Sequence, residues 1–268
     1  MAPSSTTAFI AHYQALIPER PALGTIAMIP WDTDIFGFRV ADYKLGEPDE
    51  VVSCADRLHA ALSAAAVRES LRLVACFVSP EQTKTLPVLT RMGFGFIELG
   101  LTATIADLQK HRLHSRQAGL RLSLKADCEA IEQIAANAFH SGRYSADPLI
   151  PPELSSRRYV FWVHDALSGR DSRDRMYVMG EPGDTRCFFH VRVEGESADL
   201  RLAAVRPDLQ GGPIGFRLYQ AVLQELHTQG VRHVTARLSA NNTAVLNLYA
   251  SLGFHFSHAD VVLHWHPA

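Results

Sequence analysis

The sequence predicts an α+β fold in two halves, with a mixed and mostly antiparallel central sheet flanked by helices. Helix-like and strand-like hydrophobic patterns alternate along residues 58–105 and again along residues 119–268. Within the second stretch, three strand-like segments follow one another between residues 174 and 205 with only short turns, which is typical of antiparallel hairpins. The chain has 268 residues, of which 47% are apolar and 20% are charged, and this composition is sufficient for one or two domains with a hydrophobic core.

The first half begins its regular pattern with an alanine-rich helix, "LHAALSAAAVRES", followed by a short apolar strand over Leu73–Val78. A short helix then ends at Gly93, and the strand after it ends near Ile105. The polar and basic segment "ADLQKHRLHSRQAG" connects the halves, and a helical linker fits this segment as well. We therefore expect an N-terminal domain over residues 1–112 and a second domain over residues 113–268.

The second half has a fuller pattern of elements. A strand in "GLRLSL" precedes a helix in "ADCEAIEQIAANAF", a loop over residues 140–156 and a helix over residues 156–168. Three strands follow, in "DRMYVMG", "TRCFFHVRVEG" and "SADLRLAAVRP", and then a glycine-rich loop opens a helix that reaches about Gly230. The strand "VRHVTARLS", a short helix ended by Gly253 and strands around "FHFSH" and "ADVVLHWH" come next, in that order.

The loop "LQGGPIGFRLYQ" at residues 209–220 has the features of an anion-binding helix start. The first N–H groups of a helix have no partner within it and carry a partial positive charge, so a pyrophosphate binds there readily. Gly211, Gly212 and Gly215 allow the backbone to approach phosphate and to adopt positive φ. Pro213 suits the first helical position but removes one N–H donor. The loop is therefore either an anion cradle with one hydrogen bond fewer or a helix-capping turn without a ligand.

Three motifs in this half resemble the acetyl-CoA-binding core of the GNAT N-acetyltransferases. They are Val205-Arg206-Pro207, the glycine loop from Gln210 to Gly215, and the helix motif from Asn242 to Tyr249 that ends at Gly253-Phe254. The resemblance extends over about residues 119–268, and the motifs stand in the order of the family. In the first half, "LTRMGFGFIEL" resembles the end of such a core without a glycine loop. This likeness implies a GNAT fold preceded by a truncated, degenerate GNAT-like domain.

The resemblance to the GNAT family implies acetyl-CoA as the cosubstrate and Tyr249 as the general acid that protonates the departing thiolate. A tyrosine hydroxyl suits this role because its high pKa keeps it protonated at neutral pH. The alternative is a tyrosine that only packs on an amphipathic helix with its apolar neighbours. Asn242 is expected to cap its helix and to bind the pantetheine arm. The implied cofactor-binding residues are Ala203, Ala204, Val205, Gln210, Gly211, Gly212, Ile214, Gly215, Asn242 and Asn247.

Two further segments are similar to a narrower group, the acetyltransferases of nucleotide-linked amino sugars of the dTDP-fucosamine type. One contains Trp31-Asp32 and Phe36-Gly37, and the other contains Arg143-Tyr144 and Asp147-Pro148. Arg143 can pair with a sugar-nucleotide pyrophosphate, Tyr144 can stack on a base or sugar, and Asp147 can accept from hydroxyls. Alternatively, this segment is a surface loop with a plain Asp-Pro turn, and the two N-terminal aromatic residues belong to a core. The expected acceptor-binding residues are His140, Arg143, Tyr144 and Asp147.

Composition excludes several other classes of protein. The formal net charge of -2 gives no overall field that would draw the chain to nucleic acid or to an anionic membrane. No apolar run reaches the roughly 18–20 residues of a membrane span, and the N-terminal segment lacks the pattern of a signal peptide. The cysteines lie far apart in the sequence, which indicates reduced thiols and a cytoplasmic protein. The "HWH" segment at 264–266 has no third ligand at a suitable spacing, so we expect no metal site.

These observations predict an N-acetyltransferase that moves an acetyl group from acetyl-CoA directly to the amine of a nucleotide-linked deoxyamino sugar. No serine–histidine–acid arrangement or HExxH motif supports a hydrolase. A peptide, protein or antibiotic amine is the alternative acceptor within the same class of enzyme. A non-catalytic GNAT-fold module is the alternative outside that class, although Asn242, Tyr249 and most of the glycine loop favour the enzyme. The sequence leaves the oligomeric state open, including a homodimer.

Overall fold

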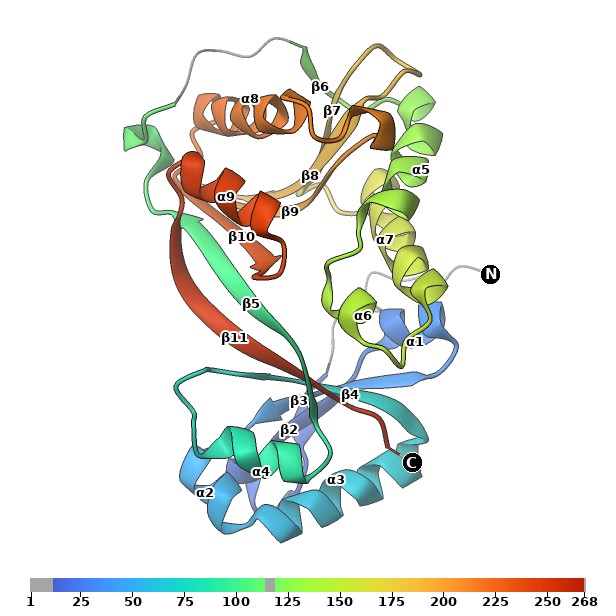
Figure 1. Ribbon diagram of the computed structural model, residues 1–268, viewed down its shortest axis with the longest axis vertical. Helices are drawn as coiled ribbons and strands as arrows, with labels where there is room; N and C mark the ends of the chain where they lie inside the picture. The colour runs from blue at the N-terminus through green and yellow to red at the C-terminus, as the bar shows by residue number, and fades with distance from the viewer. Residues whose placement is uncertain (1–11, 114–118, 268) are drawn as a thin grey trace. The chain divides into compact units, whose positions relative to one another are not determined.

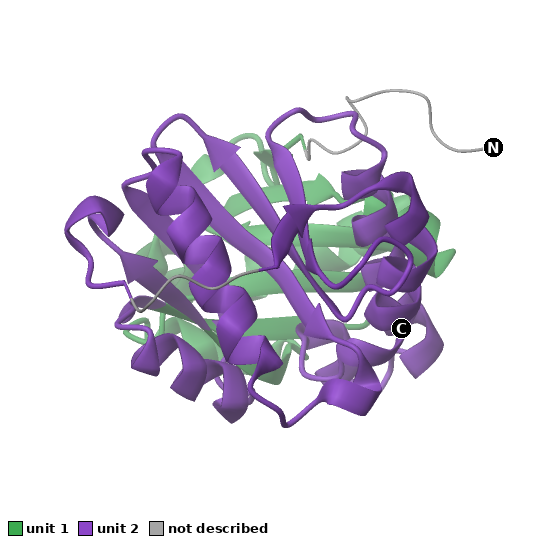
Figure 2. Cartoon of the chain, turned by 90° about the horizontal axis from the view of Figure 1, so that it is seen from above, with its two compact units in different colours: residues 1–100, 259–268 green, residues 101–258 purple. Residues whose placement is uncertain are grey.

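The computed structural model describes residues 12–113 and 119–267 (Figure 1). The chain forms two compact units, one made of Met1–Gly100 with Ala259–Ala268 and the other of Leu101–His258 (Figure 2). The C-terminal residues thus return to the first unit. The sequence predicts a single domain boundary between residues 112 and 113, and this boundary remains a proposal. Two expectations fall partly outside the described ranges: the lack of a signal peptide in residues 1–20 and the connecting segment over residues 106–119. Within that segment, Leu108–Lys110 forms the short 3₁₀ helix η3.

The first unit contains a sheet in the order β1 (Gln14–Ala15), β2 (Gly24–Met28), β3 (Arg39–Leu45), β4 (Leu71–Val78), β11 (His255–Trp265) and β5 (Gly95–Ile105). β3 and β4 are parallel, whereas β1 with β2, β2 with β3, and β4 with β11 are antiparallel. The helices of this unit include η2 (Pro21–Leu23), α1 (Pro30–Phe36), α2 (Pro48–Ser53), α3 (Ala55–Glu69) and α4 (Thr85–Arg91). The long strands β5 and β11 contribute one part to each unit.

The helices and strands predicted in this half are confirmed. α3 contains neither glycine nor proline, and it ends at Ser70, which has a φ of 52°. β4 follows directly from Leu71, slightly before the predicted start at Leu73. α4 leads to β5 through Gly93, whose φ of 95° favours glycine. The face of α3 that enters the core of this unit consists of Leu58, Leu62, Ala65 and Ala66.

The second unit contains strands in the order β11, β5, β10 (His233–Ser239), β9 (Ser197–Val205), β8 (Cys187–Glu194), β7 (Asp174–Met179) and β6 (Leu120–Leu122). The strands from β6 to β9 form successive antiparallel pairs, as the sequence predicted, and β9 and β10 are parallel. The helices include η3 (Leu108–Lys110), η4 (Lys125–Asp127), α5 (Cys128–Ala138), α6 (Arg143–Ala146), α7 (Pro152–Leu167), η5 (Pro207–Leu209), α8 (Ile214–Thr228) and α9 (Thr243–Ser251).

Two hydrophobic cores lie on the two faces of the sheet in this second unit. α8 and α9 pack on one face, over side chains that include Phe189 and Leu200. α5 and α7 pack on the other face, over side chains that include Phe188 and Leu202. Because each face is covered by a pair of helices, the unit is a layered α+β structure with a mixed sheet, as the sequence predicted.

Some expected elements differ in extent from those observed. α7 begins at Pro152 rather than at residue 156, because proline is accepted in the first turn of a helix. The loop expected between α5 and α7 contains the short helix α6. The two strands expected at the C-terminus form the single strand β11, since no glycine or proline interrupts His255–Trp265. No helix within the described residues is long and apolar enough to cross a membrane.

Candidate active site

β9 and β10 separate from each other within the sheet of the second unit. Their parallel pairing runs from Ser197–His233 to Leu200–Ala236, whereas β9 continues to Val205. Beyond Leu200, the main-chain groups of β9 on the β10 side therefore have no partner in that strand. An extended chain with amide groups, such as pantetheine, can bind in this opening by hydrogen bonds to the main chain. The predicted cofactor-binding residues of this strand lie here: Ala203, Ala204 and Val205.

A bulge in β9 lies at the same place. The pairing with β8 shifts register between His190–Leu202 and Val191–Leu200, which leaves Arg201 as an extra residue. The burial pattern shows the same shift, because Leu200 faces the core under α8 and α9 whereas Leu202 faces the core under α5 and α7. Residues two apart in a regular strand face the same side. The bulge thus puts a main-chain segment outside the regular ladder where the two strands part.

The glycine loop leads from β9 through η5 into α8. Gly211 has a φ of 77°, a conformation that favours glycine. Pro213 lies at the N-cap, one position before its predicted place, and its carbonyl accepts from the N–H of Arg217 at 3.1 Å. The N-cap N–H has no partner inside a helix either, so proline is compatible with this position. Within the described residues, no backbone acceptor takes the N–H groups of four loop residues: Gly211, Gly212, Ile214 and Gly215.

These N–H groups stand at the positive end of α8 and can hold a phosphate. Side-chain contacts hold the loop in place. Gln210 Nε2 donates to the carbonyl of Val205 at 3.3 Å, which ties the loop to the end of β9. Arg206 donates to Asp208 and to Asp184, each at 2.7 Å, and these two carboxylates raise the pKa of its guanidinium. Arg206 is therefore engaged by the protein, which leaves the main chain of the loop as the predicted phosphate-binding element.

A buried carboxylate holds the turn between β7 and β8 on which Asp184 stands. Asp127 has 0% exposure and accepts from Arg121 at 2.6 and 2.8 Å. It also accepts from Thr185 Oγ1 at 2.8 Å and from the N–H of Gly183 at 3.3 Å. These donors, Arg121 first among them, hold the pKa of Asp127 far below its usual range. The glycine loop is therefore connected, through Asp184, to a buried ion pair.

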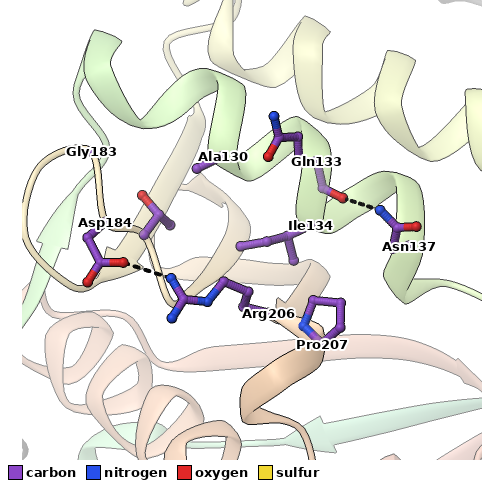
Figure 3. A pocket seen from close by; sticks show the side chains of 9 residues that line it. Ala130, Gln133, Ile134, Asn137, Gly183, Asp184, Arg206 and Pro207 are labelled. Atoms are coloured by element: carbon purple, nitrogen blue, oxygen red, sulfur yellow. Dashed lines mark hydrogen bonds and ion pairs between the residues drawn. The ribbon is translucent and has the colours of Figure 1, made fainter.

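A pocket of about 330 Å³ lies between α5 and the residues that enter the glycine loop (Figure 3). The ion pair of Asp184 and Arg206 forms one side of it, and Gln133 and Asn137 of α5 form the other. Asn137 Nδ2 donates to the carbonyl of Gln133 at 2.8 Å, so its amide is partly engaged. None of the predicted site residues lines this pocket, which therefore lies beside the predicted cofactor site and is distinct from it.

Asn242 connects the start of α9 with the segment expected to bind the acceptor. Its Oδ1 accepts from the N–H of Val245 at 3.2 Å, so Asn242 caps the helix as predicted. Its Nδ2 donates to Ser141 Oγ at 3.1 Å. Ser141 lies between α5 and α6, within the predicted acceptor segment. Asn247, which was also predicted to bind the cofactor, lies exposed on α9.

Tyr249 lies on the buried side of α9 and is 4% exposed. Its ring packs edge-on against Phe254 and against Tyr219 of α8, with centroids 4.8 and 5.4 Å apart. Burial first, and then the neighbouring Tyr219, raise the pKa of Tyr249 well above its ordinary value. Burial also raises the pKa of Tyr219 to about 12. Tyr249 thus stays protonated as an acid requires, and its packing also agrees with the alternative of a core tyrosine.

Tyr144 and Arg143, two of the predicted acceptor residues, contact each other in α6. Tyr144 is 2% exposed, and the guanidinium groups of Arg143 and Arg158 lie over its ring, 4.5 and 5.0 Å from the centroid. Arg143 also donates to the hydroxyl of Tyr144 at 2.7 Å. Because two cations already stack on this ring, stacking on an acceptor would require that one of them moves.

The other two predicted acceptor residues have local partners as well. Asp147 is 2% exposed, and its Oδ1 accepts from the N–H of Leu149 at 2.9 Å. His140 is exposed, and its Nε2 lies 2.9 Å from the carbonyl oxygen of Asn137. Arg143 and His140 are therefore the accessible members of the predicted acceptor set, and Tyr144 and Asp147 are the buried ones.

Three residues beside the predicted site residues were not predicted from the sequence pattern: Ser141, Arg201 and Tyr219. Ser141 bonds to Asn242, and Tyr219 packs against Tyr249. A tyrosine on the apolar face of the helix after the glycine loop was a usable signal for Tyr219. Arg201 had no such signal, because it continues the regular alternation of apolar and polar residues in "ADLRL". Ser141 had none either, because its partner lies far away in the sequence.

A model of the acetyltransferase (GNAT) family matches residues 177–254. This stretch runs from β7 to the end of α9 and contains the strand opening, the glycine loop and Tyr249. The match therefore falls on the elements that carry the candidate active site.

Curated relatives are similar at low identity. The spore coat polysaccharide biosynthesis protein SpsD of Bacillus subtilis is 28% identical over 128 residues, which cover 48% of this chain and 44% of that protein, so the match spans less than half of that relative. The dTDP-fucosamine acetyltransferase of Escherichia coli is 26% identical over 176 residues, which cover 66% of this chain and 74% of that enzyme. The ribosomal protein bS18 alanine N-acetyltransferase of Salmonella typhimurium is 29% identical over 104 residues, which cover 38% of this chain and 70% of that enzyme.

Solved structures show the same fold over most of the chain. A GCN5-related N-acetyltransferase from Sphaerobacter thermophilus has a TM-score of 0.66 at 15% identity and covers 93% of this chain and 78% of its own. A tandem GNAT protein from the clavulanic acid biosynthesis pathway has a TM-score of 0.59 at 16% identity and covers 92% and 79%. At this identity the likeness is one of fold, and it confirms the predicted GNAT fold with a GNAT-like first half. Residues 177–254 thus match the acetyltransferase (GNAT) family, within a chain that has the GNAT fold.

Proposed function

We propose that this protein transfers the acetyl group of acetyl-CoA to the amine of a nucleotide-linked deoxyamino sugar. The observation that carries the proposal is the opening of β9 from β10 after Leu200, which leads directly into the glycine loop. The acceptor class is supported by similarity to a dTDP-fucosamine acetyltransferase and to a polysaccharide biosynthesis protein. The match to the first of these extends over most of that enzyme, which makes it the more informative of the two.

The chain has the groups that acetyl-CoA requires. Main-chain groups of β9 between Arg201 and Val205 would bind the pantetheine arm, and the amide of Asn242 would add a polar contact near them. The unpaired N–H groups at the start of α8 would bind the pyrophosphate despite the missing donor at Pro213. Acetyl-CoA supplies an acetyl group that is activated as a thioester.

The transfer requires that the amine attacks the thioester, that the developing oxyanion is stabilised and that the thiolate leaves. The neutral amine of the acceptor attacks the thioester carbonyl, a C–N bond forms, the C–S bond breaks, and the amine loses its proton to solvent or to a base. The main chain at the Arg201 bulge is suited to stabilise the developing oxyanion by an N–H group outside the ladder. Tyr249 donates its hydroxyl hydrogen to the departing thiolate.

The raised pKa of Tyr249 shapes this last step. A thiol has an ordinary pKa of about 8.5, which is lower than that of the tyrosine. We therefore expect the hydroxyl to stabilise the thiolate by a hydrogen bond. Because the tyrosine is the weaker acid, the hydrogen stays mainly on Tyr249. Such a donor acts over the whole neutral pH range.

The acceptor is the less constrained part of the proposal. Arg143 is the predicted partner of the acceptor phosphate, and His140 is the accessible polar residue beside it. A protein or peptide amine is the second candidate, since part of the chain is also similar to a ribosomal protein alanine N-acetyltransferase. That match covers only 38% of this chain, so we favour the amino sugar.

Release of the CoA thiol, measured with a panel of acceptors, tests the function. The panel contains dTDP- and UDP-linked amino sugars, the matched free amino sugars, peptides with different N-termini, and aminoglycosides. We expect the largest kcat/KM with a nucleotide-linked amino sugar. A larger value with a peptide or an aminoglycoside would reassign the acceptor.

Acetyl-CoA binding, measured by thermal unfolding, tests whether the protein is an acetyltransferase. A ligand present at 100 times its Kd stabilises the folded state by about 2.7 kcal/mol, which corresponds to a rise in Tm of roughly 5 °C or more. No rise in Tm at saturating acetyl-CoA would contradict the enzyme and favour a non-catalytic module.

A further inference from the structure

Two arginines follow the last paired residues of β9 and β10. Leu200 and Ala236 form the last pair, so Arg201 and Arg237 are the next residues on the two strands. Leu200 and Ala236 both face the core under α8 and α9. Because successive residues of a regular strand face opposite sides, Asp199 and Arg237 belong to the other face of the sheet. Arg201 is the bulge residue, and its hydrogen bond to Asp199 places its guanidinium on that face as well. They therefore flank the strand opening on the same face.

The face with the two arginines is the one that an acceptor can approach. On the opposite face, α8 and α9 close the sheet with buried side chains that include Leu218 and Tyr249. The core under α5 and α7 contains residues of β7, β8 and β9, and β10 exposes Thr235 and Arg237 beyond it. An amine that reaches a thioester at the strand opening therefore passes the two arginines.

Arg201 has the geometry of a guanidinium that is held in place and still accessible. Its Nε donates to Asp199 Oδ2 at 3.1 Å, and the side chain is 25% exposed. Asp199 is paired across the strands with Arg192 of β8. Burial first, and then the charge of Arg201, lower the pKa of Arg192, which shows that the positive charges lie near one another.

We propose that Arg201 and Arg237 bind the diphosphate group of the acceptor. This inference rests on the proposed function and specifies which part of the acceptor the enzyme recognises. A guanidinium binds phosphate by two parallel hydrogen bonds, and two guanidiniums on neighbouring strands match the two phosphate groups of a diphosphate. The enzyme thereby selects nucleotide-linked amino sugars over free ones.

Titration of the CoA-saturated protein with inorganic pyrophosphate tests this site separately from catalysis, because CoA then occupies the glycine loop. We expect isothermal titration calorimetry to show binding to the wild type. Arg201→Gln and Arg237→Gln should each weaken it by about 10-fold or more, the usual effect of losing one charged partner. Arg232→Gln removes an exposed arginine at the opposite end of β10 and should leave binding unchanged. A CoA-saturated wild type that does not bind pyrophosphate, or variants that bind it equally well, would overturn the proposal.

Steady-state kinetics with two acceptors give the second test. Arg237→Gln should lower kcat/KM for a nucleotide-linked amino sugar by about 10-fold or more and leave the value for the matched free sugar within about 3-fold. Arg237→Lys keeps the charge and should recover part of the loss. An equal loss with both acceptors would contradict the assignment. If the wild type acetylates no amino sugar at all, the proposed function fails, and the pyrophosphate titration still decides whether the two arginines bind a diphosphate.

Discussion

The side-chain amide of Asn242 joins the first turn of α9 to the segment before α6. Its Nδ2 donates to Ser141 Oγ at 3.1 Å, across 101 positions of sequence, while its Oδ1 caps the helix. Asn242 follows β10, one of the two strands that part at the predicted cofactor site. The hydrogen bond therefore links the predicted acceptor segment to a residue that is expected to contact pantetheine.

Substitution of Asn242 separates its two hydrogen bonds. Asn242→Ser keeps a side-chain oxygen that can cap α9 and is too short to reach Ser141, so we expect little loss of stability and a KM for the acceptor raised by about 5-fold. Asn242→Ala removes both bonds and should cost about 1 kcal/mol of stability in addition. Ser141→Ala should match Asn242→Ser in steady-state kinetics. Unchanged KM values in Ser141→Ala would show that the bond has only a structural role.

Tyr249→Phe keeps the ring in its aromatic cluster and deletes the hydroxyl. Folding and acetyl-CoA binding should hardly change, whereas kcat should fall by roughly 100-fold, the usual scale of general acid catalysis. Tyr177→Phe is the matched control, because it removes a buried hydroxyl of the same core that bonds to Gln229 and should leave kcat unchanged. Near wild-type kcat in Tyr249→Phe, measured while chemistry limits the rate, would identify Tyr249 as a packing residue.

The pH dependence of the wild type follows from the raised pKa of Tyr249. The rate should rise with pH as the acceptor amine loses its proton. A group whose pKa is raised keeps its proton at higher pH, so ionisation of Tyr249 should not lower the rate below about pH 10, the ordinary tyrosine value. If kcat falls between pH 8 and 10 in the wild type and not in Tyr249→Phe, the pKa of Tyr249 is not raised.

Substitutions that change side-chain volume or the number of N–H donors test whether the glycine loop binds acetyl-CoA. A Cβ at Gly215 would lie 3.6 Å from Val205 Cγ2, an ordinary contact, so Gly215→Ala should fold normally. Gly215→Val places a branched side chain where the phosphate approaches and should weaken acetyl-CoA binding strongly. Pro213→Gly restores one N–H and should leave binding equal or tighter by at most about 1 kcal/mol. If calorimetry gives Gly215→Val the same Kd as the wild type, the cofactor binds elsewhere.

Arg143 and Arg158 offer a matched pair, because both stack on Tyr144. Arg143→Ala should raise the KM for a nucleotide-linked acceptor by about 10-fold and change the KM for acetyl-CoA much less, since it removes a charged partner of phosphate. Arg158→Ala disturbs the same ring and should have the smaller effect on the acceptor. Equal effects of the two variants would indicate that Arg143 acts only by packing on Tyr144.

Asp127→Asn tests the buried ion pair behind the glycine loop. The variant leaves Arg121 without its charged partner and should destabilise the fold by about 3 kcal/mol. Because the folded-state pKa of Asp127 is lowered, its stabilisation is complete above the ordinary value of about 4 and is lost as the pH falls below it. The stability difference between wild type and variant should therefore be constant from pH 7 to 5 and shrink below about pH 4. Glu129→Gln on the exposed side of α5 is the control, and an equal loss in it would contradict a special role of Asp127.

The local pattern of the chain was sufficient to predict most helices and strands of both units. Gly93 and Gly253 end their helices with positive φ, and Asn242 caps α9, because these features depend on a few neighbouring residues. The sequence also determined where the glycine loop stands and which family it resembles. The family match later fell on the same stretch.

Only the tertiary structure decided how distant segments meet. The parting of β9 from β10 and the bulge at Arg201 depend on hydrogen bonds between strands, and no local pattern encodes the residue at which such pairing stops. The contact of Ser141 with Asn242 likewise joins segments that are distant in sequence. For the same reason, the sequence predicts Tyr144 and Asp147 in a loop that contacts the acceptor, whereas both residues are buried in the structure. Burial depends on what the rest of the chain packs over a side chain, so local composition can place an element and leave its surroundings undetermined.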